Sequence, residues 1–312
     1  MPTDHMLDDS LIHQAWDNAI APRLTIDAGD TVTIRTRDAS NNYYSKDSTA
    51  FDVANKGPFK GHALTGPVFV RDAAPGDVLS VELVAMKPGR DYGWTAIMPG
   101  RGLLPEADFG DPFLQIWDLS DGRLARMPQR RDIAVPIAMF PGVMGTALAE
   151  PGAHSTMPPR RTGGNMDIKH LTVGATAYIP IEVEGALFST GDAHAAQGDG
   201  EVCVTAIETW SEVTMRFGLK TDAGFAEPQF HTHGPFVAGP GGYYVTTAQG
   251  PDLYANAQNA TRYMIDHLVR ERGLSREEAY VLCSVCVDLK ISEIVDAPNW
   301  LVSAFLPEAV FV

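Results

Sequence analysis

Two stretches decide the class of fold: LTIDAGDTVTIRTRDA at residues 24–39 and GPVFVRDAAPGDVLSVELVAM at residues 66–86. The TVTIR segment alternates polar and apolar side chains, which is the pattern of a half-exposed strand. Each stretch also carries a Gly-Asp turn directly ahead of an apolar strand, AGD at 28–30 and PGD at 75–77. Short strands separated by such turns are typical of a β-barrel or a β-sandwich.

The strand pattern continues on the carboxyl side of these stretches. We expect strands in ATAYIPIEVEGALF (175–188) and EVCVTAIETWSEVTMRF (201–217). Residues 87–131 are instead rich in glycine, proline and aromatic residues, and they include GRDYGWTAIMPGRGLLP. That composition predicts a long loop or insertion, and long ordered loops often carry function.

Helical periodicity begins only after Pro251. Gly273 fits a helix C-cap, and Ser275 with Glu278 fits the capping box of a second helix. The end of the chain, DLKISEIVDAPNWLVSAFL (288–306), returns to strand character. Apolar residues recur at spacings of three and four in the first helical segment, as on one face of a helix: Leu253, Ala257, Ala260, Met264 and Leu268.

The sequence therefore predicts a mostly β protein, barrel-like or sandwich-like, with a C-terminal α/β unit. We expect three regions. Residues 1–131 form a β-rich region with the loop insertion, residues 132–250 form a second β region that carries the functional loop, and residues 251–312 form an α/β unit that packs on both.

Charge and composition narrow the classes of partner. The 312 residues include 24 Lys and Arg against 39 Asp and Glu, a formal net charge of −15. Such a chain repels phosphate backbones and anionic lipids, so we expect no nucleic acid and no membrane as partner, whereas small neutral or cationic substrates are not disfavoured. The polar, acidic first residues and the absence of a long apolar run predict a cytoplasmic protein. A homo-oligomer is our default expectation.

The three cysteines do not indicate a disulfide framework. Cys283 and Cys286 form a C-x-x-C within AYVLCSVCVDL, which reads as an apolar, buried element. Burial makes a thiol inert, so we interpret the pair as core residues, with thiol oxidoreductase chemistry as the alternative.

Functional side chains are densest in GDAHAAQGDGE, residues 191–201, between two predicted strands. This predicted loop combines Asp192, His194, Gln197, Asp199 and Glu201. Carboxylates with an imidazole suit zinc or a related divalent ion that keeps an open position for water. A calcium loop, in a non-catalytic binding protein, and a plain acidic surface turn are the alternatives.

A second cluster, PPRRTGGNMDI at 158–168, offers Asn165 and Asp167, which share a face if the segment is extended. His62 and Asp38 flank predicted strands and add candidates for metal binding. His231 and His233 are a weaker rival pair. The nucleophile elbow and the phosphate-binding glycine loops are absent, which leaves metal-assisted hydrolysis as the best-fitting chemistry.

Three strings, in order along the chain, resemble the acetamidase/formamidase family. They are HALTGPVFVRDAAPGDVLSVEL (62–83), GGNMDIKHLTVGATAYIPIEVEGALFSTGDAHAAQGDGEVCVTAIET (163–209) and CSVCVDLKISEIVDAPN (283–299). The resemblance implies a β-rich fold with a C-terminal α/β unit. It also implies hydrolysis of short linear amides to acid and ammonia. Lactams, which are cyclic amides, remain an alternative substrate.

The resemblance and the residue chemistry together give a hypothesis for the site. We expect a divalent metal, zinc before calcium, bound by Asp167 and His194 with Asp38 or His62 completing the site. Glu201 is the expected proton shuttle, with Asp192 in reserve. The remaining assignments are as follows: Asp192 and Asp199 are further catalytic candidates, and Asn165, Gln197 and His62 are candidates for substrate binding.

Overall fold

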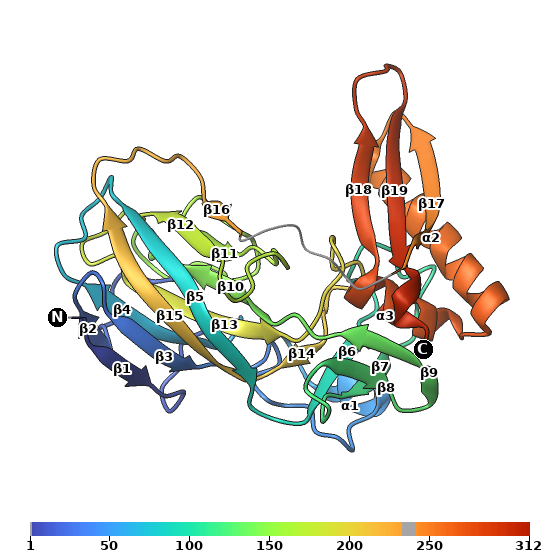
Figure 1. The fold of residues 1–312 in the computed structure, drawn as a ribbon, viewed down its shortest axis with the longest axis horizontal. Coiled ribbons are helices and arrows are strands. Elements are labelled where there is room, and N and C mark those ends of the chain that lie inside the picture. The colour runs from blue at the N-terminus through green and yellow to red at the C-terminus, as the bar shows by residue number, and fades with distance from the viewer. Residues whose placement is uncertain (1, 233–240) are drawn as a thin grey trace.

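The computed structural model describes residues 2–232 and 241–312 (Figure 1). Strands from distant parts of the chain alternate in its first sheet, which joins the beginning of the chain to residues beyond 200. In order, this six-stranded sheet contains β1 (Asp4–Leu7), β3 (Thr31–Arg35), β15 (Ser211–Lys220), β5 (Val78–Pro88), β12 (Thr176–Pro180) and β16 (Gln229–His231).

The second sheet is longer and contains the strands around the densest polar cluster. Its order is β11 (Gly163–Asn165), β10 (Phe140–Gly145), β13 (Phe188–His194), β14 (Glu208–Thr209), β6 (Tyr92–Ile97), β7 (Phe113–Asp118), β8 (Leu124–Met127) and β9 (Arg130–Pro136). β4 (Leu64–Val70) pairs with β13 and with β2 (Leu24–Ile26). The short helix α1 (Ala50–Asn55) precedes β4.

The C-terminal unit is a three-stranded sheet with two helices. The sheet has the order β17 (Tyr243–Gly250), β19 (Trp300–Pro307) and β18 (Asp288–Glu293). Helices α2 (Leu253–Arg272) and α3 (Arg276–Cys286) lie between β17 and β18 in the chain. The 3-10 turn η1 (Glu308–Val310) follows β19 and is the last element. Figure 1 shows this unit rising from the end of the molecule formed by β6 to β9.

A shared apolar core joins the two large sheets face to face. Alternate residues of β3 and β15, such as Ile34 and Met215, point inward and are fully buried. They belong to one cluster with Val68 and Phe188 of the second sheet. Because both strand orders are open-ended, the described residues form a sandwich and no closed barrel. The predicted mostly β fold with a C-terminal α/β unit is confirmed.

The helical predictions are also confirmed. Gly273 ends α2 with a left-handed φ of 62°, and its N–H donates to the Val269 carbonyl. Ser275 and Glu278 form the reciprocal capping box at the start of α3. The apolar stripe of α2 packs into a second core with α3 and the β6–β9 strands. None of the helices in the described ranges is long and apolar enough to cross a membrane.

Two local predictions are wrong in part. Residues 87–131 contain the antiparallel strands β6, β7 and β8, the end of β5 and the beginning of β9, and the predicted long loop spans only residues 98–112 between β6 and β7. Residues 188–194, expected to end in a loop, are strand β13, whereas residues 201–207 contain no strand. β13 is an interior strand with β4 and β10 as neighbours and is buried throughout, so its sequence shows no alternation between core and solvent.

The cysteines lie where the apolar pattern predicts. Cys283 and Cys286 are in α3, and Cys203 faces the same core. Burial raises the pKa of the Cys203 thiol to about 11 and raises the pKa values of the other two. A thiolate at neutral pH is therefore disfavoured at all three positions.

We expect the native protein to leave these thiols unmodified by a water-soluble thiol reagent, because the reactive thiolate is both scarce and enclosed. The chain unfolded in denaturant should react at 3 cysteines. The absorbance of the chromophore that the reagent releases measures the number of modified thiols in the native and in the unfolded protein. Rapid modification of the native protein would contradict the buried placement.

Candidate functional site

Four carboxylates surround one imidazole where the two apolar cores meet. His194 ends β13, and its Nε2 lies 3.4 Å from Oδ1 of Asp192, 3.4 Å from Oε1 of Glu208 and 3.9 Å from Oε1 of Glu201. Asp192 shares a face with His194 because they are two residues apart on one strand. Glu208 lies on the neighbouring strand β14, where it pairs with His194. Asp167 enters from the turn after β11.

Gln197 fixes the orientation of the His194 ring. The Gln197 Nε2 donates to the Asp167 carbonyl at 2.8 Å, so its Oε1 faces the ring and lies 2.9 Å from His194 Nδ1. Nδ1 therefore carries the proton, and in the neutral ring Nε2 presents its lone pair to the carboxylates. This is the usual arrangement behind a metal-binding histidine, whose second nitrogen donates to a protein acceptor.

The backbone of the site is held in unusual conformations. Asp167, Asp192 and Glu201 have φ values of 49°, 57° and 42°, in the left-handed region that non-glycine residues rarely adopt. Such residues cost of order 1–3 kcal/mol each and persist where the surrounding structure imposes them, often at functional sites. The carboxylates of all three residues lie in the cluster around His194.

Gly142 of β10 leaves room for this convergence. A Cβ at this position would lie 2.6 Å from Asp167 Oδ1 and 2.7 Å from Cε1 of His194. Both distances are too short for real contacts, so the site requires glycine here for space rather than for backbone freedom.

Several polar atoms in the centre of the cluster are buried without a hydrogen-bond partner. They are Oδ1 of Asp167, Oδ1 of Asp192, Nε2 of His194 and Oε2 of Glu208. Orphaned buried atoms are rare in native proteins, and these converge on one place. The ligand atoms form two groups within 4.8 Å, Asp167–His194–Glu201 and Asp192–His194–Glu208. The chemistry of both groups fits a divalent cation.

Electrostatics supports the need for positive charge. Burial, with the charge of Asp192, raises the pKa of Asp167 to about 7 against the opposing effect of His194. Burial raises the pKa values of Glu201 and Glu208 well above their usual range, and neighbouring carboxylates add to the effect. Burial disfavours charge on His194, but the carboxylates outweigh it and raise the pKa of the imidazole to about 9. The cluster therefore favours bound protons or a cation.

A small cavity of about 60 Å³ opens onto the cluster, with Asp192, Glu201 and Glu208 in its wall. His62 also lines it; Thr156 Oγ1 lies 3.0 Å from His62 Nδ1, and His62 Nε2 is 3.6 Å from Asp192 Oδ2. On another wall, the Asn165 Nδ2 donates to the Met157 carbonyl at 3.1 Å. That bond leaves Asn165 Oδ1 as an acceptor without a partner beside the cavity.

Asp38 lies apart from this cluster, and its oxygens are already occupied. Its Oδ1 accepts from the backbone N–H groups of Ser40 and Asn42 at 2.8 and 2.9 Å. Its Oδ2 accepts from Trp94 Nε1 at 3.0 Å and pairs with Arg90. These bonds give Asp38 a structural role, and neither metal-capable group of the described residues includes it.

Asp199 also points elsewhere. Its Oδ2 lies 3.9 Å from Lys169 Nζ, and its backbone N–H donates to Asp288 Oδ1 at 3.1 Å. Lys169 is buried and pairs with Asp288 at the start of β18. Together with the bond from the Gly198 N–H to the Ser284 carbonyl, at 2.8 Å, these contacts tie the 195–201 loop to the C-terminal unit. The loop that carries Glu201 is thus anchored by α3 and β18.

Glu208 is the site residue that the sequence analysis missed. It lies within the predicted strand 201–217, which also contains Glu201 and Glu212, and the sequence offers no signal that distinguishes it from them. His231, of the rival pair, lies exposed at the end of β16, and His233 is outside the described residues. His231 therefore stands apart from the buried cluster.

Comparison with known proteins places this site in a family. The model of the acetamidase/formamidase family matches residues 2–151 and 147–312. An acetamidase of Mycolicibacterium smegmatis is 27% identical over 86% of this chain and 84% of its own length. A formamidase of Methylophilus methylotrophus is 28% identical over 97% of this chain and 90% of its own.

The fold has a close counterpart among solved structures. A gamma lactamase from Delftia acidovorans superposes with a TM-score of 0.91 over 98% of this chain and 93% of its own, at 24% identity. At that identity the likeness speaks for the fold alone. Since the family model spans nearly the whole sequence, the chain belongs to the acetamidase/formamidase family.

Proposed function

We propose that the protein hydrolyses the C–N bond of small linear amides, such as formamide or acetamide, to a carboxylic acid and ammonia. Its family membership supports the reaction class. The observation that carries the proposal is the set of orphaned polar atoms around His194 Nε2 beside a small cavity. At about 60 Å³ the cavity has the volume of roughly two liquid waters, which suits a very small amide.

Asp192, His194 and Glu208 are the proposed ligands of a divalent metal. All three are fully buried, and each has an atom without a hydrogen-bond partner. An imidazole at the centre of the group favours zinc over calcium, which prefers six to eight oxygen ligands. A divalent cation bound there polarises a carbonyl and lowers the pKa of a bound water.

Glu201 and Asp167 form the second group and are the proposed proton-handling pair. Glu201 keeps contact with the cavity, and its side chain is 16% exposed. From there its carboxylate takes the proton of the attacking water and delivers it to the leaving nitrogen. Asn165 Oδ1 accepts an N–H of the substrate amide, which holds the carbonyl toward the metal ligands. His62 stands across the cavity beside Asp192.

Gln197 takes a positioning role in this scheme rather than the predicted substrate-binding role, because both ends of its amide are engaged by His194 and Asp167. A gamma lactam remains the second candidate substrate, and the larger space next to the cavity favours testing it. The cytoplasmic location and the homo-oligomer stay predictions.

We expect ammonia release from formamide, acetamide or propionamide, or ring opening of a γ-lactam to its 4-amino acid, and loss of that activity after chelation because the cation carries part of the catalysis. Zinc should restore it. The same panel ranks linear against cyclic amides. Full turnover by protein whose metal content has been measured as zero would remove the metal from the proposal.

Single substitutions distinguish the proposed metal ligands from the proposed proton-handling pair. Glu208→Gln should lose bound metal, since one ligand charge is gone, whereas Glu201→Gln and Asp167→Asn should retain it and lose at least about a hundredfold in kcat. Metal content by mass spectrometry and ammonia release measure the two effects. Metal loss in Asp167→Asn with retention in Glu208→Gln would restore Asp167 as the ligand expected from sequence.

Gly142→Ala tests whether close packing holds the cluster. The added methyl group displaces Asp167 and His194, so kcat/KM should fall at least about tenfold, while the fold persists. Gly110→Ala is the matched control, because its Cβ would meet its nearest neighbour, the Glu106 carbonyl, at 3.5 Å. Unchanged activity in Gly142→Ala would show that the cluster tolerates displacement and would contradict the packing argument.

A further inference from the structure

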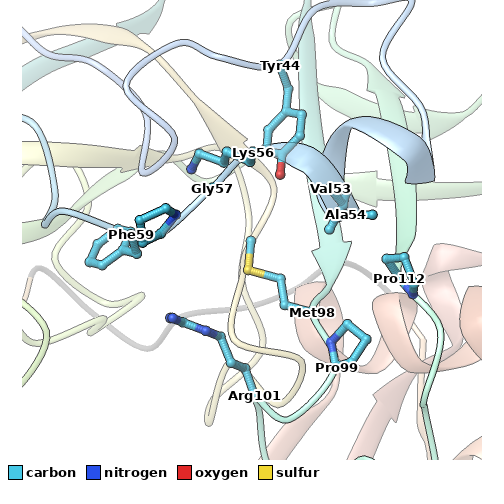
Figure 2. Close-up of a pocket in the computed structure, with 11 residues that line it drawn as sticks. Tyr44, Val53, Ala54, Lys56, Gly57, Phe59, Met98, Pro99, Arg101 and Pro112 are labelled. Atoms are coloured by element: carbon cyan, nitrogen blue, oxygen red, sulfur yellow. The ribbon is translucent and has the colours of Figure 1, made fainter.

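A second cavity adjoins the inner one (Figure 2). It measures about 370 Å³ and extends over Tyr44, Val53 and Pro112. The inner and outer cavities have common wall residues: Lys56, Phe59, Met98 and Arg101. A molecule whose amide group lies in the inner cavity can therefore extend past these residues into the outer one.

Two of the common residues are cations that point the same way. Lys56 follows α1, and Arg101 lies in the 98–112 connection. In Figure 2 their side chains extend toward the side of the outer cavity on which Phe59 lies. The outer cavity and the inner site thus meet between two positive charges.

Neither cation is paired with a carboxylate. Across residues 2–232 and 241–312, Lys56 and Arg101 make no ion pair and no side-chain hydrogen bond. Both side chains lie near aromatic rings: Lys56 Nζ is 5.6 Å from the centroid of the Tyr44 ring, and Arg101 Cζ is 6.0 Å from that of the Phe59 ring. Nearby Arg90, by contrast, pairs directly with Asp38.

The lack of a partner is costly for Lys56, which is half-buried. Burial lowers the pKa of its amine, and the charges of Asp38 and Glu208 offset this only in part. A cation that loses water without gaining a partner is destabilised. In a chain of net charge −15, acids are abundant, so two unpaired cations at one junction indicate a binding site for an external anion.

We propose that Lys56 and Arg101 bind the carboxylate of a substrate whose amide group occupies the inner cavity, so that monoamides of short dicarboxylic acids are preferred over neutral amides. This inference rests on the proposed amide hydrolysis. The guanidinium of Arg101 supplies paired donors that match a carboxylate, and Lys56 supplies a point charge. Phe59 and Met98 provide apolar contact for the connecting methylene groups.

The test compares charged and neutral substrates of equal length. Monoamides of the two-, three- and four-carbon dicarboxylic acids are each compared with the corresponding diamide. The measured rate of the diamide is divided by two, because it has two equivalent amide groups. For the best chain length we expect kcat/KM of the monoamide to exceed that of the diamide at least tenfold. Equal or faster turnover of every diamide would overturn the inference.

Variants assign the preference to the two cations. Lys56→Met and Arg101→Met should each lower the ratio of monoamide to diamide kcat/KM at least fivefold. Lys56→Arg keeps a cation at this position, so it should retain most of the ratio of the unmodified protein. Lys60→Met is the control, since it removes the same charge from an exposed residue that lines neither cavity. An equal fall of the ratio in Lys60→Met would mean that long-range charge, not the pocket, is responsible, and would overturn the proposal.

A binding measurement keeps the inference apart from the proposed function. If no amide, including acetamide, is hydrolysed, the proposed function fails. Calorimetric titration with succinate then decides the anion site on its own. Binding that weakens at least tenfold in Lys56→Met and Arg101→Met, but not in Lys60→Met, supports the site; succinate that does not bind, or binds all four proteins alike, overturns it.

Discussion

The crowding of four carboxylates, two of them fully buried, around the single imidazole of His194 is the constraint on which the rest of the structure depends. Removing one ionised carboxylate from water costs several kcal/mol unless charge and hydrogen bonds compensate it. Here the neighbouring bases within the cluster are His194 and His62, and the central atoms have no hydrogen-bond partners. The arrangement is stable only with bound protons or a cation at its centre, and the protein must hold like charges together until one arrives.

Strand β13 holds the like charges of the cluster together because it runs from one apolar core to the other. Phe188, at its start, packs in the sandwich core, while Ala195 and Ala196, just beyond its end, pack in the core of the C-terminal unit. Both ends are thus fixed by burial, and Asp192 and His194 between them cannot swing toward solvent. The loop after β13 is tied to α3 and β18 through Asp199 and Asp288, so the position of Glu201 depends on the C-terminal unit.

Secondary structure could be predicted from the sequence where burial alternates or recurs periodically along the chain. Half-exposed strands such as β3 alternate, and α2 and α3 carry stripes and caps, so their patterns were readable. β13 has no solvent-facing side and gave no such signal. Asp38 and Glu208 show the same limit for the site. Both are buried acids, but one is saturated by its own loop, Trp94 and Arg90, and the other faces the cluster, a difference that exists only after folding.

Net charge carries less information about a small substrate than the charges around the site do, for a related reason. The net charge of −15 determines the electrostatic potential far from the protein, which governs encounters with nucleic acid or lipid. At short range, the few charges around a cavity determine which groups bind there. In this protein the inner cavity is acidic and its junction with the outer one is cationic. In the proposed binding mode, the cationic junction holds the anionic group of the substrate, and the amide is directed inward.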